Sequence, residues 1–155
     1  MLSDEEKREI DHELLHYPTK RAISMDALMV VQRHRGGWVS DESLRDVAEY
    51  LDMTPDELDS SATFYSRIYR KPVGRHVILL CNSISCWVMG YGDLRAYLHR
   101  RLGIDLGGTT ADTRFTLLPI VCLGTCDHAP ALMIDDDLYR DLTPDQLDAL
   151  LERYT

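Results

Sequence analysis

The stretch HVILLCNSISC, residues 76–86, joins a short apolar run to a pair of cysteines, Cys81 and Cys86. An apolar run of this length predicts a buried strand, here one that ends at the first cysteine. A second pair, Cys122 and Cys126, follows the similar run FTLLPIV. The chain has no other cysteine. Each pair is expected where a strand runs out into a loop, so the four thiols could converge if both strands end at the same edge of a sheet.

The order of predicted elements around these two runs indicates the fold class. The first 70 or so residues predict four helices, and the rest predicts a strand, a helix, a strand, a β-hairpin and a helix. This second order is that of a thioredoxin-like domain. We therefore predict an α+β protein with an N-terminal helical domain at residues 1–73 and a thioredoxin-like domain at residues 74–155, with the boundary at the turn KPVG.

Local signals mark where several of these elements begin and end. Ser3 and Glu6 have the spacing of a capping box, and Thr54 and Glu57 repeat it with a proline at the first helical position. Pro119 lies inside the second apolar run and cannot donate a ladder hydrogen bond. That strand is therefore expected near an edge of the sheet or at a bulge.

Composition and charge exclude several functions. The 155 residues carry a net charge of −9, and the segment at residues 41–59 is strongly acidic, which argues against nucleic acid as the main partner. The first residues lack the basic and apolar regions of a secretory signal, and no apolar run approaches the roughly 20 residues of a membrane span. We expect a cytoplasmic protein, where thiols stay reduced.

Spacing leaves three interpretations of the cysteines open. Four residues separate Cys81 from Cys86 and three separate Cys122 from Cys126, so the two-residue spacing of a redox dithiol is absent. Structural zinc sites tolerate such spacings, whereas a [2Fe-2S] cluster needs two thiolates on each iron, in loops whose backbone N–H groups can point at the sulfur atoms. Loops that contain Ser83, Ser85, Gly124 and Thr125 suit that need. The spacing favours an iron–sulfur cluster over zinc, and both over disulfides.

Longer motifs carry a family resemblance. The two cysteine pairs, the phrase CLGTCDHAP and the stretches GWVSDESL and ATFYSRIYRKPVGRHVI resemble the family of thioredoxin-like [2Fe-2S] E subunits of bacterial NADH:quinone oxidoreductase, respiratory complex I. The resemblance covers nearly the whole chain. It implies one [2Fe-2S] cluster bound by Cys81, Cys86, Cys122 and Cys126, and a helical domain before residue 74.

The resemblance also implies a function and partners. It indicates an electron-transfer subunit whose cluster exchanges single electrons with the flavin mononucleotide (FMN) of a partner NADH-binding subunit. Further iron–sulfur subunits of the peripheral arm are expected partners, and the complex would hold the chain at the cytoplasmic side of the inner membrane. No phosphate loop or G-x-G-x-x-G fingerprint is present, so we expect no substrate site on this chain. The alternatives are the equivalent diaphorase subunit of an NAD-linked hydrogenase or formate dehydrogenase, and a zinc-stabilised adaptor.

Two surface features are candidates for contact with such a partner. The segment at residues 64–92 contains no Asp or Glu and includes a basic group that could meet an acidic partner. Its members are Arg67, Arg70, Lys71 and Arg75. Apolar and small residues beside the cysteines are expected either to pack against the partner or to shield the cluster from water. They are Trp87, Val88, Met89, Leu123, Ala129 and Pro130.

Overall fold

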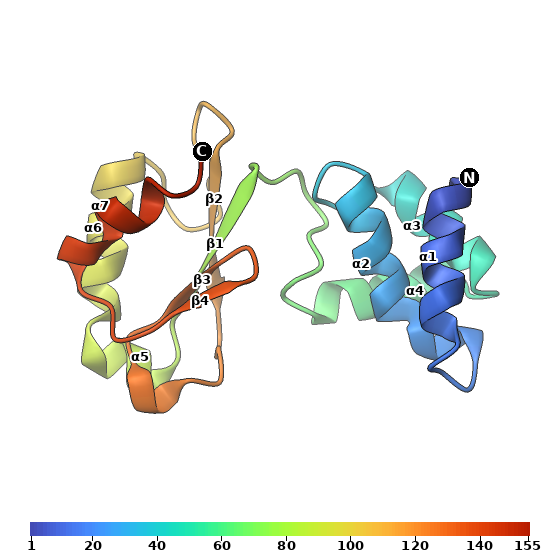
Figure 1. The fold of residues 1–155 in the computed structure, drawn as a ribbon, viewed down its shortest axis with the longest axis horizontal. Helices are drawn as coiled ribbons and strands as arrows, with labels where there is room; N and C mark the ends of the chain where they lie inside the picture. Colours follow the sequence, from blue (N-terminus) through green and yellow to red (C-terminus); the bar gives the residue numbers. More distant parts are fainter. The chain divides into compact units, whose positions relative to one another are not determined.

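The structure, a computed structural model, describes residues 1–155 and divides the chain into two units, Met1–Pro72 and Val73–Thr155 (Figure 1). The N-terminal unit is helical, and the C-terminal unit combines a four-stranded sheet with helices. No helix in either unit has both the length and the apolar character that crossing a bilayer requires.

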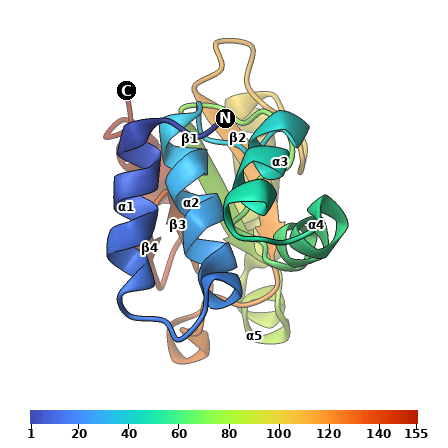
Figure 2. The ribbon, with the colours of Figure 1, turned by 90° about the vertical axis from the view of Figure 1, so that its right-hand side faces the viewer.

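Four α-helices build the N-terminal unit. They are α1 (Asp4–Leu14), α2 (Ser24–His34), α3 (Asp41–Tyr50) and α4 (Pro55–Phe64), and a short 3-10 helix, η1 (Lys20–Ile23), precedes α2. Helix α2 lies between α1 on one side and α3 and α4 on the other (Figure 2), and it contacts all three. Apolar residues spaced along each helix face inward and form one core. The four predicted helices are confirmed.

Capping residues set the starts of two of these helices. The Glu6 backbone N–H donates to Ser3 Oγ at 3.2 Å, and the Ser3 N–H donates to Glu6 Oε2 at 2.7 Å. Thr54 and Glu57 form the same reciprocal pair at the start of α4. Both capping boxes predicted from the sequence are therefore present.

The C-terminal unit is built on a sheet with the strand order β2-β1-β3-β4. Its strands are β1 (His76–Cys81), β2 (Phe115–Ile120), β3 (Leu132–Ile134) and β4 (Asp137–Tyr139). Strands β1 and β2 are parallel, whereas β3 pairs antiparallel with both β1 and β4. Pro119 lies on β2 at the edge of the sheet, as its missing N–H requires.

Helices cover one side of this sheet (Figure 1). They are α5 (Ile84–Met89), α6 (Tyr91–Leu102) and α7 (Leu147–Leu151), with the 3-10 helices η2 (Cys126–His128) and η3 (Pro144–Gln146). Leu94 and Leu98 of α6 belong to the same buried core as Ile78 and Leu80 of β1. Helix α6 ends at Leu102, and its C-cap residue Gly103 has a φ of +70°, in the left-handed region that favours glycine.

Helix α5 was not predicted. We expected the segment after Cys81 to be a loop, but Cys86 lies within this six-residue helix, which ends at Gly90 with φ +126°. The helix has no side-chain cap bond at its start. A helix this short and uncapped leaves little periodic signal, which explains why the sequence did not indicate it.

Gly74 permits a close backbone approach just before β1. A Cβ atom at this position would lie 2.9 Å from the carbonyl oxygen of Thr113 and 3.0 Å from the carbonyl carbon of Phe115. The Gly74 N–H also donates to the buried Oγ1 of Thr116 at 2.7 Å. We expect Gly74→Ala to destabilise the C-terminal unit by about 1–3 kcal/mol in urea unfolding, because backbone atoms must move to relieve the overlap.

Gly92 provides the matched control for this substitution. It lies in α6, and nothing within 4 Å would meet an added Cβ. Gly92→Ala is expected to be neutral or to stabilise the chain by up to about 1 kcal/mol, because alanine restricts the unfolded chain and favours helix. Equal unfolding midpoints for the two variants would contradict the steric role of Gly74.

Candidate metal centre

The two cysteine pairs lie at the same end of the sheet. Cys81 is the last residue of β1, and its register partner on the parallel strand β2 is Ile120, two residues before Cys122. Because the two strands run in the same direction, the segments that follow them leave the sheet together. Helix η2, which begins at Cys126, contacts α5, which contains Cys86. The fold thus places both cysteine-bearing segments at the same end of the sheet, with Cys86 and Cys126 on helices that contact each other.

One pair of thiols has a spacing that suits metal binding. All four cysteines are free. Cys122 Sγ and Cys126 Sγ lie 3.7 Å apart, well beyond the roughly 2.05 Å of a disulfide. Two thiolates bound at about 2.3 Å to one tetrahedral metal ion lie about 3.7 Å apart. This pair can therefore bind one metal ion without rearrangement. No three of the chain's Cys, His, Asp and Glu side chains come together as a single-ion site would require.

The environment of Cys86 and Cys126 disfavours the thiolate form of these two side chains. Burial raises the pKa of the Cys86 thiol to about 11, and its hydrogen bond with Cys81 acts in the same direction. The pKa of Cys126 is also raised, first by its hydrogen bond with Cys122 and then by the negative charge of that thiolate. Metal ions supply the positive charge that deprotonated thiolates need, and their binding releases the thiol protons.

Hydrogen-bond donors surround the thiols. The Gly124 N–H donates to Cys122 Sγ at 3.3 Å, from a backbone with φ +74° that favours glycine. The neighbouring Ser85 hydroxyl partly offsets the rise in the pKa of the Cys126 thiol. Thr125 is buried, and its Oγ1 has no hydrogen-bond partner. An unsatisfied buried hydroxyl typically costs about 1–3 kcal/mol. These hydrogen-bond donors, including the Thr125 hydroxyl that has no partner, fit a bound group with negatively charged sulfur atoms.

Three histidines, including the one next to the cysteines, pair with carboxylates rather than with the thiols. His128 follows Cys126 closely in sequence, but its Nδ1 lies 2.8 Å from Asp141 Oδ2. His34 and His76 likewise pair with carboxylates, Glu9 at 2.9 Å and Asp135 at 2.6 Å. Each of these three imidazoles is therefore engaged by a carboxylate.

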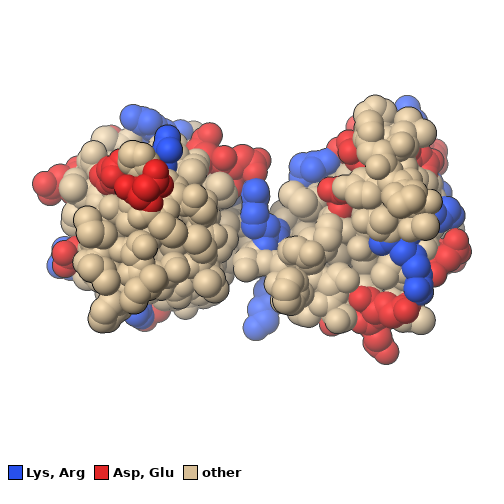
Figure 3. Space-filling model, turned by 90° about the horizontal axis from the view of Figure 1, so that it is seen from below, with Lys and Arg blue, Asp and Glu red and all other residues tan.

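An exposed apolar rim surrounds the cysteines. We use this name for Ile84, Trp87, Val88, Met89 and Val121, each between 61% and 73% exposed. The sequence indicated the three residues of α5 at positions 87–89 but missed the other two. It also indicated Leu123, Ala129 and Pro130, which are half-buried or buried and so contribute to the unit's interior. Seen from the end where α5 lies, the surface of this unit is mostly uncharged (Figure 3).

Arg70 of the basic group at residues 67–75 forms ion pairs within the N-terminal unit. Arg70 donates to Asp59 Oδ1 at 2.8 Å, to Asp41 Oδ1 at 2.7 Å and to the carbonyl oxygen of Val39. Its charge is therefore neutralised by α3 and α4. We exclude Arg70 from the basic surface that the sequence suggested.

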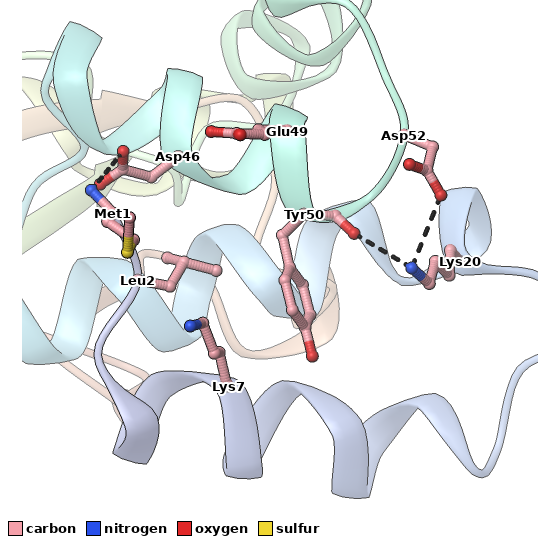
Figure 4. A pocket seen from close by; sticks show the side chains of 8 residues that line it. All are labelled: Met1, Leu2, Lys7, Lys20, Asp46, Glu49, Tyr50 and Asp52. Carbon is pink, nitrogen blue, oxygen red and sulfur yellow. Dashed lines mark hydrogen bonds and ion pairs between the residues drawn. The ribbon is translucent and has the colours of Figure 1, made fainter.

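The N-terminal unit has a pocket of its own, and no cysteine lines it. It has a volume of about 370 Å³ and lies beside Tyr50 (Figure 4). Lys20 Nζ lies 3.4 Å from the Tyr50 carbonyl oxygen and 3.5 Å from Asp52 Oδ2, so its charge is already compensated. The Tyr50 hydroxyl donates to Asp11 at 2.5 Å. These internal pairs make the pocket a structural feature of the helical unit.

Comparison with known proteins identifies the family. The family model of the thioredoxin-like [2Fe-2S] ferredoxins matches residues 10–155. The E subunit of NADH-quinone oxidoreductase from Pseudomonas aeruginosa is 49% identical over 99% of this chain and 92% of its own length. The corresponding E subunit of Escherichia coli is 48% identical over 99% of the chain and 92% of its length. The chain belongs to the family of NADH-quinone oxidoreductase E subunits. The resemblance and the class of function predicted from the sequence, an electron-transfer subunit, are confirmed.

Solved structures support the fold of this E-subunit family member. The NAD+-reducing [NiFe]-hydrogenase in its H2-reduced state shares 25% identity with a TM-score of 0.68 over 82% of this chain. The match covers 22% of that hydrogenase chain, so our chain spans about a fifth of its length. The air-oxidized form gives a TM-score of 0.70 at 24% identity over 85% of this chain. The predicted α+β fold class is confirmed.

Proposed function

We propose that Cys81, Cys86, Cys122 and Cys126 bind one [2Fe-2S] cluster, and that this chain exchanges single electrons with FMN on a partner NADH-binding subunit. The observation that carries the proposal is the convergence of the two cysteine pairs, with one pair at the 3.7 Å spacing of two thiolates on one metal ion. When bound, such a cluster takes up and releases one electron at a time.

The chain's own residues would hold and tune this group. Two thiols are buried and two are exposed, so the cluster would lie at the protein surface with one side shielded by the core. The N–H of Gly124 already donates to Cys122 Sγ and the Ser85 hydroxyl acts on Cys126, so both would offset negative charge there. Sequence motifs for nucleotide binding are absent. FMN and NADH are therefore assigned to the partner subunit.

Metal analysis with electron paramagnetic resonance (EPR) tests this proposal. The full chain, purified without oxygen, is expected to be red-brown and to contain about two irons and two labile sulfides. Reduction with dithionite should give the EPR signal of a one-electron-reduced cluster. Stoichiometric zinc without iron in a colourless protein would instead support the zinc-stabilised adaptor.

The exposed apolar rim supports a partner at the cluster end. Apolar residues at this exposure are costly in water unless a partner covers them, and aromatic residues often dominate such interfaces. We expect Trp87→Glu to weaken binding of the FMN subunit at least about 30-fold, because truncating a central tryptophan typically costs about 2 kcal/mol or more. Titration of the purified FMN subunit with the full chain measures this.

Phe64 offers a matched control on the other unit. It is 79% exposed, and Phe64→Glu introduces the same charge on an exposed aromatic position of the helical unit. Both variants should keep the visible spectrum of the cluster. Unchanged affinity in Trp87→Glu would remove the rim from the interface.

Location and the wider assembly follow from the proposed partner. We propose that the chain lies at the cytoplasmic side of the inner membrane, attached through the other subunits of an NADH-quinone oxidoreductase, including further iron–sulfur subunits.

The likeness to the NAD+-reducing hydrogenase favours a diaphorase subunit as the second candidate. The 49% identity to an NADH-quinone oxidoreductase E subunit over nearly the whole chain favours the respiratory complex. Co-purification with a hydrogenase rather than a quinone-reducing complex would decide for the alternative.

A further inference from the structure

Thr125 stands apart from the other buried polar residues. It lies between Cys122 and Cys126 in sequence, it is only 7% exposed, and its Oγ1 has no hydrogen-bond partner. No other buried side-chain nitrogen or oxygen in the chain lacks a partner. Thr116, the other buried threonine, accepts from Gly74 at 2.7 Å and pairs with Thr109 at 2.7 Å. The chain therefore satisfies its buried hydroxyl groups except for this one.

The surroundings of Thr125 indicate what its partner is. Its carbonyl oxygen already accepts the His128 N–H at 3.0 Å, which fixes the backbone at the start of η2. The donor next to it in sequence is directed at sulfur, since the Gly124 N–H donates to Cys122 Sγ at 3.3 Å. Buried hydroxyl groups are almost always hydrogen-bonded in folded proteins. The missing acceptor is therefore expected to be part of the group that the four thiols bind.

We propose that Thr125 is a positioning residue that sets the reduction potential of the cluster. Its hydroxyl donates a hydrogen bond to a sulfur atom of the bound [2Fe-2S] group, either a thiolate or an inorganic sulfide. The inference rests on the proposed function. The reduced cluster carries one more negative charge than the oxidised cluster, so the bond strengthens on reduction and favours that state.

Two substitutions separate the hydroxyl from the shape of the side chain. Thr125→Val keeps the volume and removes the donor, whereas Thr125→Ser keeps the donor. We expect the valine variant to disfavour the reduced state about tenfold, which corresponds to a potential about 59 mV lower for a one-electron couple. The serine variant should stay close to the wild type. An EPR-monitored redox titration of the full chain measures all three potentials.

Controls distinguish this inference from the proposed function. Iron and sulfide contents are measured first, and a wild-type chain without iron would overturn both the proposed cluster and the role of Thr125. Wild-type iron content in Thr125→Val with an unshifted potential would overturn the role of Thr125 alone. If the valine variant loses its cluster, Thr125→Ala takes its place. A lowered potential in alanine with recovery in serine supports the hydroxyl, and equal potentials contradict it.

Discussion

Replacing Cys122 by serine is expected to remove the visible absorption and EPR signal of the cluster, with iron content lowered more than about tenfold after anaerobic desalting. Serine offers a hard oxygen where the iron favours a thiolate, and the pair with Cys126 can no longer hold one metal ion between two sulfurs. Cys122 is exposed, so the substitution removes no buried packing. Loss of the spectrum would therefore report loss of a ligand rather than loss of the fold.

Ser83 provides the control for this experiment. It precedes α5 in the other cysteine-bearing segment, and its side chain makes no cap hydrogen bond. Ser83→Ala should keep the cluster, and both variants should keep the far-UV circular dichroism of the helical unit. A wild-type spectrum in Cys122→Ser would remove Cys122 from the proposed ligand set.

Much of this architecture could be predicted because its signals are local. The capping boxes at Ser3 and Thr54 fix helix starts through bonds that span three residues. The strand β1 is a continuous apolar run, and Pro119 marks the edge strand. Convergence of the cysteines followed from one further step, because parallel neighbouring strands release their following segments at the same end.

The parts that the sequence did not predict depend on contacts between distant segments. Ile84 and Val121 have apolar side chains of the kind that usually lie in a core, and only the tertiary structure shows that they are exposed. Thr125 is an ordinary loop residue in sequence, and its burial without a partner emerges only from the fold. Arg35 is a third case, because its partner Glu6 lies 29 residues away.

Arg35 joins three helices of the N-terminal unit through two carboxylates, of which Glu6 is buried. Its Nε donates to Glu6 Oε1 at 2.7 Å and its Nη2 to Glu6 Oε2 at 3.0 Å, while Nη1 donates to Asp46 Oδ2 at 2.8 Å. The Glu6 side chain is only 3% exposed. A bidentate pair with a buried carboxylate is a strong arrangement, and removing one partner leaves a buried charge uncompensated.

Arg35→Met is therefore expected to destabilise the helical unit by about 3–5 kcal/mol. A unit of 72 residues typically has about 4–11 kcal/mol in total, so the substitution should bring it close to unfolding. The chain has two tryptophans, and Trp38 is the one in this unit. Urea unfolding followed by Trp38 fluorescence in a Trp87→Phe background reports on the unit alone.

Arg33→Met on the same helix is the matched control. Arg33 pairs with Glu9, but Arg33 is exposed and Glu9 is only partly buried, and ion pairs near the solvent contribute about 0–1 kcal/mol. The same change of side chain two positions away should therefore leave the unfolding midpoint nearly unchanged. Similar losses in the two variants would mean that the buried network of Arg35 contributes no more than a surface ion pair.

Acid provides a second test of the same network. The hydrogen bonds of Arg35 lower the pKa of Glu6 to about 2, against an ordinary value of about 4.3. A lowered carboxyl pKa adds stability that is complete above the ordinary value and is lost as the pH falls through the folded value. Wild-type stability should thus fall between about pH 5 and pH 2, and the fall should be smaller in Arg35→Met, because the guanidinium no longer holds Glu6 ionised. The pKa of Glu9 is also lowered, mainly by its hydrogen bond with His34, and this partner is kept in both Arg35→Met and Arg33→Met. If Arg35→Met leaves the dependence of stability on pH unchanged, the loss of stability in acid arises from carboxylates other than Glu6.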